Sequence, residues 1–259
     1  MPLEFFAFLF MAGSAVGFLS GFLGLGGGII LFPVLFYMTP ALGFEPMDVK
    51  SIMGLTMAQG FFASLSATFF YKSEKLVNKS LVLTLGLSLF ASALAGSLAS
   101  KAVPDGPLLF IFGVLAIAAA AMMFMPRSYR HDEVTEDEVS FNRPLAIAIG
   151  LGLGFFLGMV GQGGAFITIP VLLYILRVPL RVALGSTLAI GVLSATAGLF
   201  GKVATGQVPF LMAGALLLGA IPLARVGGMV SKKTDTRHLR WLLALIISGA
   251  AIKVWTDIF

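Results

Sequence analysis

Long runs of apolar residues, separated by short charged stretches, dominate the chain. The runs that could each form one membrane crossing are Ser51–Tyr71, Ser80–Ser100, Gly106–Pro126, Val182–Gly201, Val203–Ala224 and, more weakly, Trp241–Thr256. Each has about the 20 residues that a helix needs to cross a hydrocarbon core of ~30 Å. Membrane-spanning strands would instead show segments of about ten residues with alternating polarity. The pattern therefore predicts an all-α integral membrane protein.

Two further uncharged runs are too long for a single crossing. Phe5–Phe44 has 40 residues and Pro144–Leu176 has 33, so as straight helices they would be roughly 60 Å and 50 Å long. Glycine clusters interrupt both runs, at Gly21–Gly28 and at Gly158–Gly164. Because glycine costs about 1 kcal/mol relative to alanine inside a helix, we expect each run to break at its cluster.

The two halves of the chain are related copies. At an offset of 137 residues, the glycines, the following proline and a tyrosine of the first long run recur in the second, so that Gly21 meets Gly158. After a shorter connection the match resumes at an offset of 131, where Thr56 meets Thr187. Such duplication is a common plan among transporters.

The duplication and the charge pattern predict three parts of the chain. Residues 1–126 form a first membrane repeat and residues 144–259 a second one. Between them lies a polar cytoplasmic linker at residues 127–143, which includes the acidic stretch His131–Val139. We interpret this stretch as a solvated connector.

The distribution of Lys and Arg favours one topology over another. If each long run crossed once, the 17 basic residues would divide between the two sides as 8 and 9. If each run instead forms a re-entrant helical hairpin, the split becomes 13 to 4, a clear positive-inside signal. The four on the non-cytoplasmic side are then Lys50, Lys101, Lys202 and Lys253. The predicted fold has two inverted repeats, each a broken or re-entrant hairpin plus three transmembrane helices, with both termini outside the cytoplasm.

The glycine-rich hairpin tips could bind an anion. A second half-helix would start near Gly28 and near Gly164, where the first N–H groups lack helical partners and the helix dipole places partial positive charge. Such a helix start binds anions without a buried Lys or Arg, whereas unwound carbonyls could still bind Na⁺. The predicted substrate-binding residues are Gly24, Gly26, Gly27, Gly28, Thr56, Gln59, Gly161, Gln162, Gly163, Gly164, Ser186 and Thr187.

Several polar and glycine positions have a competing structural interpretation. Gly13, Gly17 and Gly21 are spaced by four residues, which indicates close helix packing rather than binding. Hydroxyl groups inside membrane helices commonly bond to backbone carbonyls, and the amide of Gln162 could lock the tip instead of contacting a ligand. We expect Arg225 to extend its guanidinium to the cytoplasmic headgroups.

The sequence lacks the groups that most other functions need. It has no Cys, and no Asp, Glu or His lies in a confident span, so we expect no proton coupling through such a residue. We see no P-loop and no hydrolase or metal-ligand pattern, and therefore expect no enzymatic activity, cofactor or bound metal. The formal net charge of +5 fits cytoplasmic loops facing anionic lipids, so we expect no nucleic-acid partner.

The glycine-rich elements resemble a known family. SGFLGLGGGIILFPVLFY and GMVGQGGAFITIPVLLY, followed by GLTMA and GSTLA, are similar to the paired signatures of the TauE/SafE sulfite exporters, which are also grouped with toluene-sulfonate uptake permeases. The resemblance covers nearly the whole chain and implies a bacterial-type inner-membrane permease for sulfite, organosulfonates or related sulfur-containing anions. In the second copy Gln162 replaces Leu25 and Ala165 replaces Gly28, so the two tips are not equivalent.

Our leading hypothesis is a secondary transporter that moves a small sulfur-containing anion by alternating exposure of a midplane site. The alternative is a channel-like pore for small anions or neutral solutes, because two opposed re-entrant half-helices can also line a pore. A cation or metal permease is a third class, which the lack of Cys and of intramembrane acids weakens. The expected partners are the small anionic substrate and the lipid bilayer, with a homodimer left open.

Overall fold

The protein folds into long helices joined by short loops. The computed structural model describes residues 2–73, 76–124, 139, 141–162 and 165–258, and no strand occurs among them. Eight helices of this described part are long and apolar enough to cross a membrane. They are α1 (Leu3–Leu23), α4 (Val49–Ser73), α5 (Lys79–Ala99), α6 (Asp105–Met123), α7 (Arg143–Val160), α9 (Leu180–Ala204), α10 (Phe210–Lys233) and α11 (Thr236–Ile258). The prediction of an all-α membrane protein is confirmed.

Large apolar side chains cover much of the outer surface. Phe69, Leu218 and Leu245 are 68%, 62% and 65% exposed, although each lies in a long apolar helix. In water such a surface would mark an interaction site or an aggregation hazard. Around a bundle of membrane-spanning helices it is the surface that contacts lipid.

Two short helical segments follow the first long helix of each half. In the first half they are α2 (Gly28–Pro33), a π-helical turn η1 (Val34–Met38) and α3 (Thr39–Ala41); in the second half they are α8 (Ala165–Pro170) and the π-helical turn η3 (Val171–Ile175). Each π-helical turn directly follows a proline, Pro33 or Pro170. Proline has no N–H and clashes with the preceding turn, so a local change of helical pitch at this point has a direct cause.

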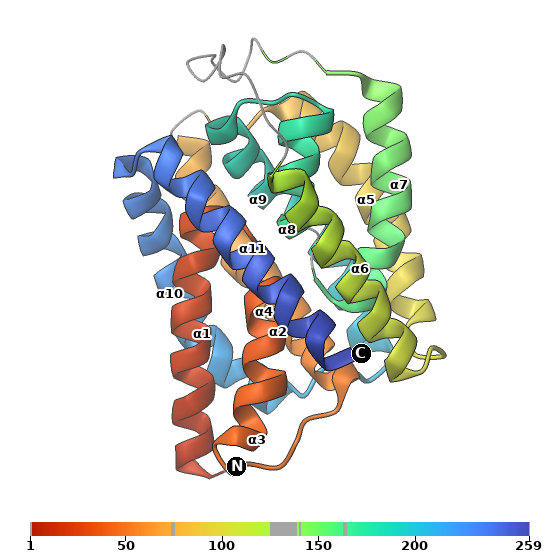
Figure 1. Ribbon diagram of the computed structural model, residues 1–259, viewed down its shortest axis with the longest axis vertical. Helices are drawn as coiled ribbons and strands as arrows, with labels where there is room; N and C mark the ends of the chain where they lie inside the picture. Colours follow the sequence, from red (N-terminus) through yellow and green to blue (C-terminus); the bar gives the residue numbers. More distant parts are fainter. Residues whose placement is uncertain (1, 74–75, 125–138, 140, 163–164, 259) are drawn as a thin grey trace.

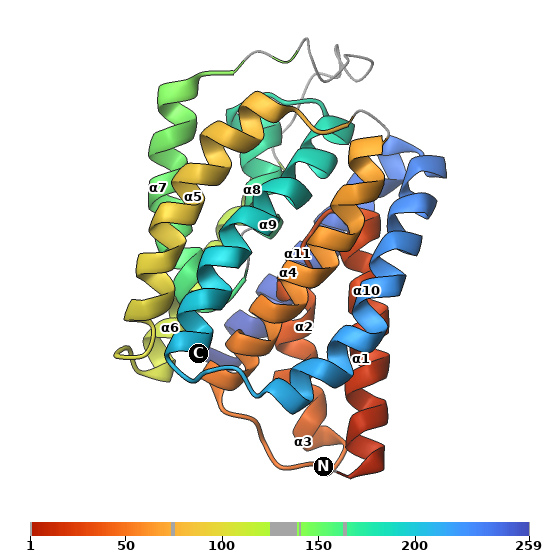
Figure 2. The ribbon, with the colours of Figure 1, turned by 180° about the vertical axis from the view of Figure 1, so that it is seen from behind.

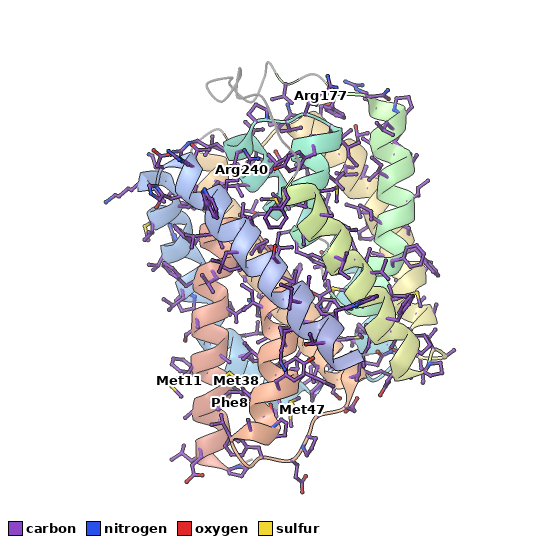
Figure 3. All side chains as sticks on the ribbon, viewed as in Figure 1. Phe8, Met11, Met38, Met47, Arg177 and Arg240 are labelled. Carbon is purple, nitrogen blue, oxygen red and sulfur yellow. The ribbon has the colours of Figure 1, made fainter. Side chains whose placement is uncertain are left out.

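The first long run returns to the end from which it started. The ring of Phe44, which follows α3, lies 4.9 Å from that of Phe5 and 6.1 Å from that of Phe8, centroid to centroid. Figure 3 shows Phe8 and Met38 at the same lower end of the molecule. The arms are unequal, because α1 with its 21 residues is about 31 Å long, whereas the returning segment Gly28–Ala41 is only about 21 Å. The structure therefore refines the predicted hairpin: its first arm alone is long enough to cross.

Helices of the two halves are interleaved by glycine contacts. α1 packs against α10, and its sequence copy α7 packs against α5, as Figures 1 and 2 show. A Cβ atom on Gly21 of α1 would meet the backbone of Ala224 in α10, and one on Gly158 of α7 would meet the backbone of Ala93 in α5. Ala93 and Ala224 are 131 residues apart, the offset of the repeat. The packing interpretation of the evenly spaced glycines is confirmed.

Other equivalent positions also make equivalent contacts. Lys50 Nζ donates to the carbonyl of Lys101 (2.9 Å), and Arg181 Nη1 donates to the carbonyl of Lys232 (3.4 Å); both members of each pair are related by the offset of 131. At the centre of the bundle, α4 packs against its copy α9 (Figure 2). In Figure 1, α1 rises from the N-terminus at the lower end, whereas α7 begins at the upper end and descends. The inverted arrangement of the halves stays a prediction, which these observations support.

One predicted helix boundary is wrong. The sequence suggested that a span ends at Gly201 and that the next begins at Val203, because Lys202 interrupts the uncharged run. Instead α9 continues to Ala204, and α10 begins only at Phe210. The break occurs where backbone chemistry requires it, at Gly206 with a φ of +74° and at Pro209, which is the N-cap of α10. The charge of Lys202 is buried inside the fold rather than placed in a loop.

Candidate substrate site at the glycine tips

The first tip is a left-handed turn between two helices. After α1 ends at Leu23, the φ angles of Gly24, Gly26 and Gly27 are +68°, +66° and +81°, a region that only glycine enters without strain. Ile30 N and Leu31 N both donate to the carbonyl of Gly27, at 3.1 and 2.9 Å, so Gly27 caps the returning helix. The N–H groups of the first turn, beginning at Gly28, then have no carbonyl within the helix to bond.

Two carboxamides lie against this helix start. Gln59, from α4, has its amide Oε1 and Nε2 2.5 and 2.7 Å from the position that a Cβ on Gly27 would take. Gln162, from the second tip, has its Oε1 in contact with the equivalent position on Gly28. The two tips therefore meet, and each contributes to one place what the other lacks: helix N–H groups from the first, an amide from the second.

Neither amide has a hydrogen-bond partner among the described residues. Gln59 and Gln162 are both 0% exposed, and both the nitrogen and the oxygen of each amide are unpaired. A buried polar group without a partner costs about 1–3 kcal/mol, and native proteins pair almost all of them. Two such amides at one helix start indicate a site built for a polar ligand, which supplies the missing partners.

The predicted hydroxyl ligands divide into two groups. Thr56 Oγ1 donates to the carbonyl of Gly161 at 2.8 Å, and Ser186 Oγ accepts from Asn78 N at 3.0 Å, so both have structural partners. Thr56 thus locks the second tip, the role that the competing interpretation gave to such hydroxyls. Thr187, the sequence copy of Thr56, is fully buried and its hydroxyl is unpaired within the described part. Among these hydroxyls, only Thr187 keeps the features of a ligand group.

The second tip mirrors the first where the structure describes it. Gly161 has a φ of +70°, and a Cβ there would meet the carbonyl of Met53, whereas a Cβ on Gly24 would lie 3.1 Å from the carbonyl of Leu184. Met53 and Leu184 are again 131 residues apart. Gly24 and Gly161 therefore allow each tip to approach a central helix. Gly163 and Gly164 lie outside the described residues.

Charged groups are scarce around the tips. In the part of the chain that the structure describes, the buried polar side chains are Ser, Thr, Asn and Gln, with Lys202 as the one charged type. The described residues also hold no cluster of His, Asp and Glu that could bind a metal ion. Arg225 is exposed on α10, which agrees with the expectation that it extends to the headgroups. The candidate site consists of neutral donors and acceptors.

A separate cavity of about 710 Å³ lies away from the tips. It is lined by residues from α6, η3 and α11, including Tyr174, Arg237, Arg240 and Trp241. Arg240, near the upper end in Figure 3, donates from Nη2 to the hydroxyl of Tyr174 at 2.9 Å. None of the predicted tip residues lines this cavity, so it is not part of the candidate site.

The sequence prediction missed Lys202. We had assigned it to the non-cytoplasmic surface, but it is 0% exposed and its Nζ contacts Ser100, Met159 and Gln207. One signal was available: at the offset of 131, Lys202 is the copy of Tyr71, a residue within a predicted span.

These features define a multi-pass membrane transporter: eight apolar helices, two duplicated glycine tips and buried unpaired amides between them. Comparison with known families agrees with this class. Residues 9–254 match the family described as Sulfite exporter TauE/SafE, and the chain belongs to this family. The resemblance seen in the sequence is confirmed, and the protein is a transporter, not an enzyme.

Individual relatives carry the same general description. The chain is similar to the probable membrane transporter protein MJ0441 of Methanocaldococcus jannaschii, with 26% identity over 92% of this chain and 91% of that protein. It is similar to the probable membrane transporter protein YunE of Bacillus subtilis, with 23% identity over 93% and 94%. A probable membrane transporter protein, ORF9, of Sinorhizobium sp shares 29% identity over 97% and 92%. No solved structure matches the chain. The inner membrane is the typical location for this family.

Proposed function

We propose that the protein is a secondary transporter of small sulfur-containing anions, such as sulfite or organosulfonates, which it binds between the two glycine tips. The observation that carries this proposal is the pair of buried, unpaired amides of Gln59 and Gln162 at the start of the returning helix. Membership in the sulfite exporter family supports the substrate class.

The chemistry of the site fits an oxyanion. Each carboxamide carries two N–H donors, and a half-turn about its terminal torsion exchanges nitrogen and oxygen, so both can present donors to the same ligand. The helix beginning at Gly28 adds free N–H groups and the positive end of its dipole. Thr187 adds a hydroxyl. An oxyanion with several acceptor oxygens can use donors from all of these groups at once.

The proposed mechanism is alternating access. Two inverted repeats, at residues 1–126 and 144–259 around the linker at 127–143, would open the site first to one side of the membrane and then to the other. The contact of the central helices α4 and α9 and the meeting of both tips at one place support this plan, because a movement of one half against the other then changes access to a shared site. Gly24, Gly26, Gly27, Gly28, Gly161, Gly163 and Gly164 would allow the backbone to approach the anion.

The test is flux of labelled sulfite and of a small labelled sulfonate into proteoliposomes, with unlabelled anions as competitors. The decisive variants are Gln59→Glu and Gln162→Glu, which keep the shape of the side chain and replace donors with a negative charge. We expect saturable, competed flux in the unmodified protein and a loss of at least about tenfold in each variant, the effect of roughly 1.4 kcal/mol.

Other outcomes would contradict the proposal in distinguishable ways. If folded protein moves neither anion, the substrate assignment is wrong. Flux without saturation or counterflow would favour the channel-like pore. A Gln162→Glu variant that gains cation flux would favour a cation permease, because a carboxylate improves a cation site and damages an anion site.

A further inference from the structure

Lys202 has a complete set of partners although it is buried. It lies in the last turn of α9 and is 0% exposed. Its Nζ donates to Ser100 Oγ at 2.7 Å, to Gln207 Oε1 at 2.8 Å and to the carbonyl of Met159 at 3.0 Å. The three oxygen atoms come from α5, from the loop after α9 and from α7, so Lys202 joins three separate segments.

These partners match the protonated form of the side chain. An ammonium group has three N–H donors and no acceptor, and Nζ faces three oxygen atoms. The hydroxyl of Ser100 donates to the carbonyl of Ser97 at 2.6 Å, so its oxygen is free to accept. The amide nitrogen of Gln207 donates to Thr205 Oγ1 at 2.8 Å, which orients the amide oxygen toward Lys202. The neighbouring groups are therefore arranged to receive a cation.

None of the three partners is a carboxylate. Burying a charge without an opposite charge costs several kcal/mol, and ionisable groups inside membrane proteins mark functional positions. The charge of Lys202 therefore requires an explanation beyond packing, and the position of its backbone partner provides one.

Met159 lies in the last turn of α7, three residues before Gln162. The last carbonyls of a helix lack intrahelical donors and carry the negative end of the helix dipole, so a cation there is stabilising. We propose that Lys202 is the positioning residue of the second tip: its ammonium group caps α7 and thereby holds Gln162 against the start of the returning helix. This inference concerns the geometry of the site proposed above, and its first test does not depend on transport.

The first tip is held by weaker chemistry at the equivalent position. Tyr71, the copy of Lys202, donates its hydroxyl to the carbonyl of Gly21 in the last turn of α1 at 3.1 Å. A charged donor makes a hydrogen bond roughly twice as strong as a neutral one. The second tip also receives the bond from Thr56 to Gly161. It is thus the more firmly held of the two, as a tip that carries an unpaired amide requires.

Cysteine labelling tests the proposal directly, because the chain has no native Cys. Leu25→Cys and Gln162→Cys place a thiol at equivalent positions of the two tips, and the rate of maleimide labelling measures how often each tip opens. In the Lys202→Met background we expect labelling at position 162 to rise about 30-fold and labelling at position 25 to change by less than about twofold. A 30-fold change corresponds to about 2 kcal/mol, within the usual range for a hydrogen bond to a charged group.

Two further backgrounds make the result specific. Lys202→Arg keeps the charge and should restore slow labelling at position 162. Tyr71→Phe removes the equivalent bond from the first tip and should raise labelling at position 25 instead. An equal rise at both tips in Lys202→Met would show general loosening and overturn the proposal, as would an unchanged rate at position 162.

Transport kinetics provide a second readout with Gln162 intact. Lys202→Met should raise the KM for the anion and leave kcat per folded molecule nearly unchanged, and Lys202→Arg should restore the KM. A lower kcat with an unchanged KM would contradict the positioning role. If the unmodified protein moves neither sulfite nor a sulfonate but the labelling pattern holds, the proposed function fails and the positioning of the second tip stands.

Discussion

Gly27 and Gly43 form a matched pair for measuring what the first tip requires of its glycine. Both have a φ of +81°, so an alanine at either position adopts the same strained backbone. They differ in surroundings: a Cβ on Gly43 meets nothing within 4 Å, whereas a Cβ on Gly27 lies 2.5 Å from Gln59 Oε1 and 2.9 Å from Val16 Cγ1. Comparing Gly27→Ala with Gly43→Ala therefore separates the backbone cost from the cost of the contact with Gln59.

The expected magnitudes follow from these two terms. A residue with a Cβ in the left-handed region costs about 1–2 kcal/mol, and this term applies to both variants. Forcing a methyl group into a packed position adds about 1–3 kcal/mol, and this term applies only to Gly27. We expect Gly43→Ala to lower the free energy of unfolding by about 1–2 kcal/mol and Gly27→Ala by about 2–5 kcal/mol.

The assay combines denaturation in mixed micelles with anion flux in proteoliposomes. Gly43→Ala should keep the KM and kcat of the unmodified protein. Gly27→Ala should lose most of its flux, because the amide of Gln59 must leave its position beside the helix start. Equal losses of stability, with equal transport kinetics, would show that the methyl group does not meet Gln59 and would refute the geometry of the site.

Two further predictions concern the hydroxyl groups and the topology. Thr56→Val should lower the free energy of unfolding by about 1 kcal/mol, because it removes a buried hydrogen bond, whereas Thr187→Val should preserve stability and weaken anion binding; denaturation and flux measured on both variants check this, and the reverse pattern would contradict the assignment of ligand and lock. Cysteines in place of Ala41 and Arg177, which are both exposed, should react with a membrane-impermeant maleimide from opposite sides of the membrane in oriented vesicles. Labelling of both from one side would show that the halves are not inverted.

Hydrophobic pattern alone located most of the helices. Ser51–Tyr71 lies within α4, and Ser80–Ser100 coincides with α5 within one residue at each end. These boundaries were predictable because a span must be apolar over about 20 residues, and charges mark where it leaves the hydrocarbon. The same rule failed at Lys202, since a charge can stay inside when three oxygen atoms surround it.

The candidate site was predictable in its residue types but not in its pairing. The glycine clusters identified both tips, and a helix start near Gly28 is confirmed by the start of α2. The sequence treated Thr56 and Thr187 as equals, because the repeat places them at equivalent positions. The structure gives one a carbonyl partner and leaves the other unpaired, a difference that depends on atoms more than 100 residues away along the chain.

By itself, the sequence determined the helical membrane class, the duplication and the positions of the helix breaks, because these depend on local properties: the length of apolar runs, the recurrence of residues and the conformational freedom of glycine. Only the tertiary structure decided that Gln162 of one tip lies against Gly28 of the other. It also decided that α1 packs against α10 rather than a helix of its own half, and that Lys202 reaches the end of α7. These contacts join residues distant along the chain, and close packing in three dimensions, which no local pattern encodes, selects among them.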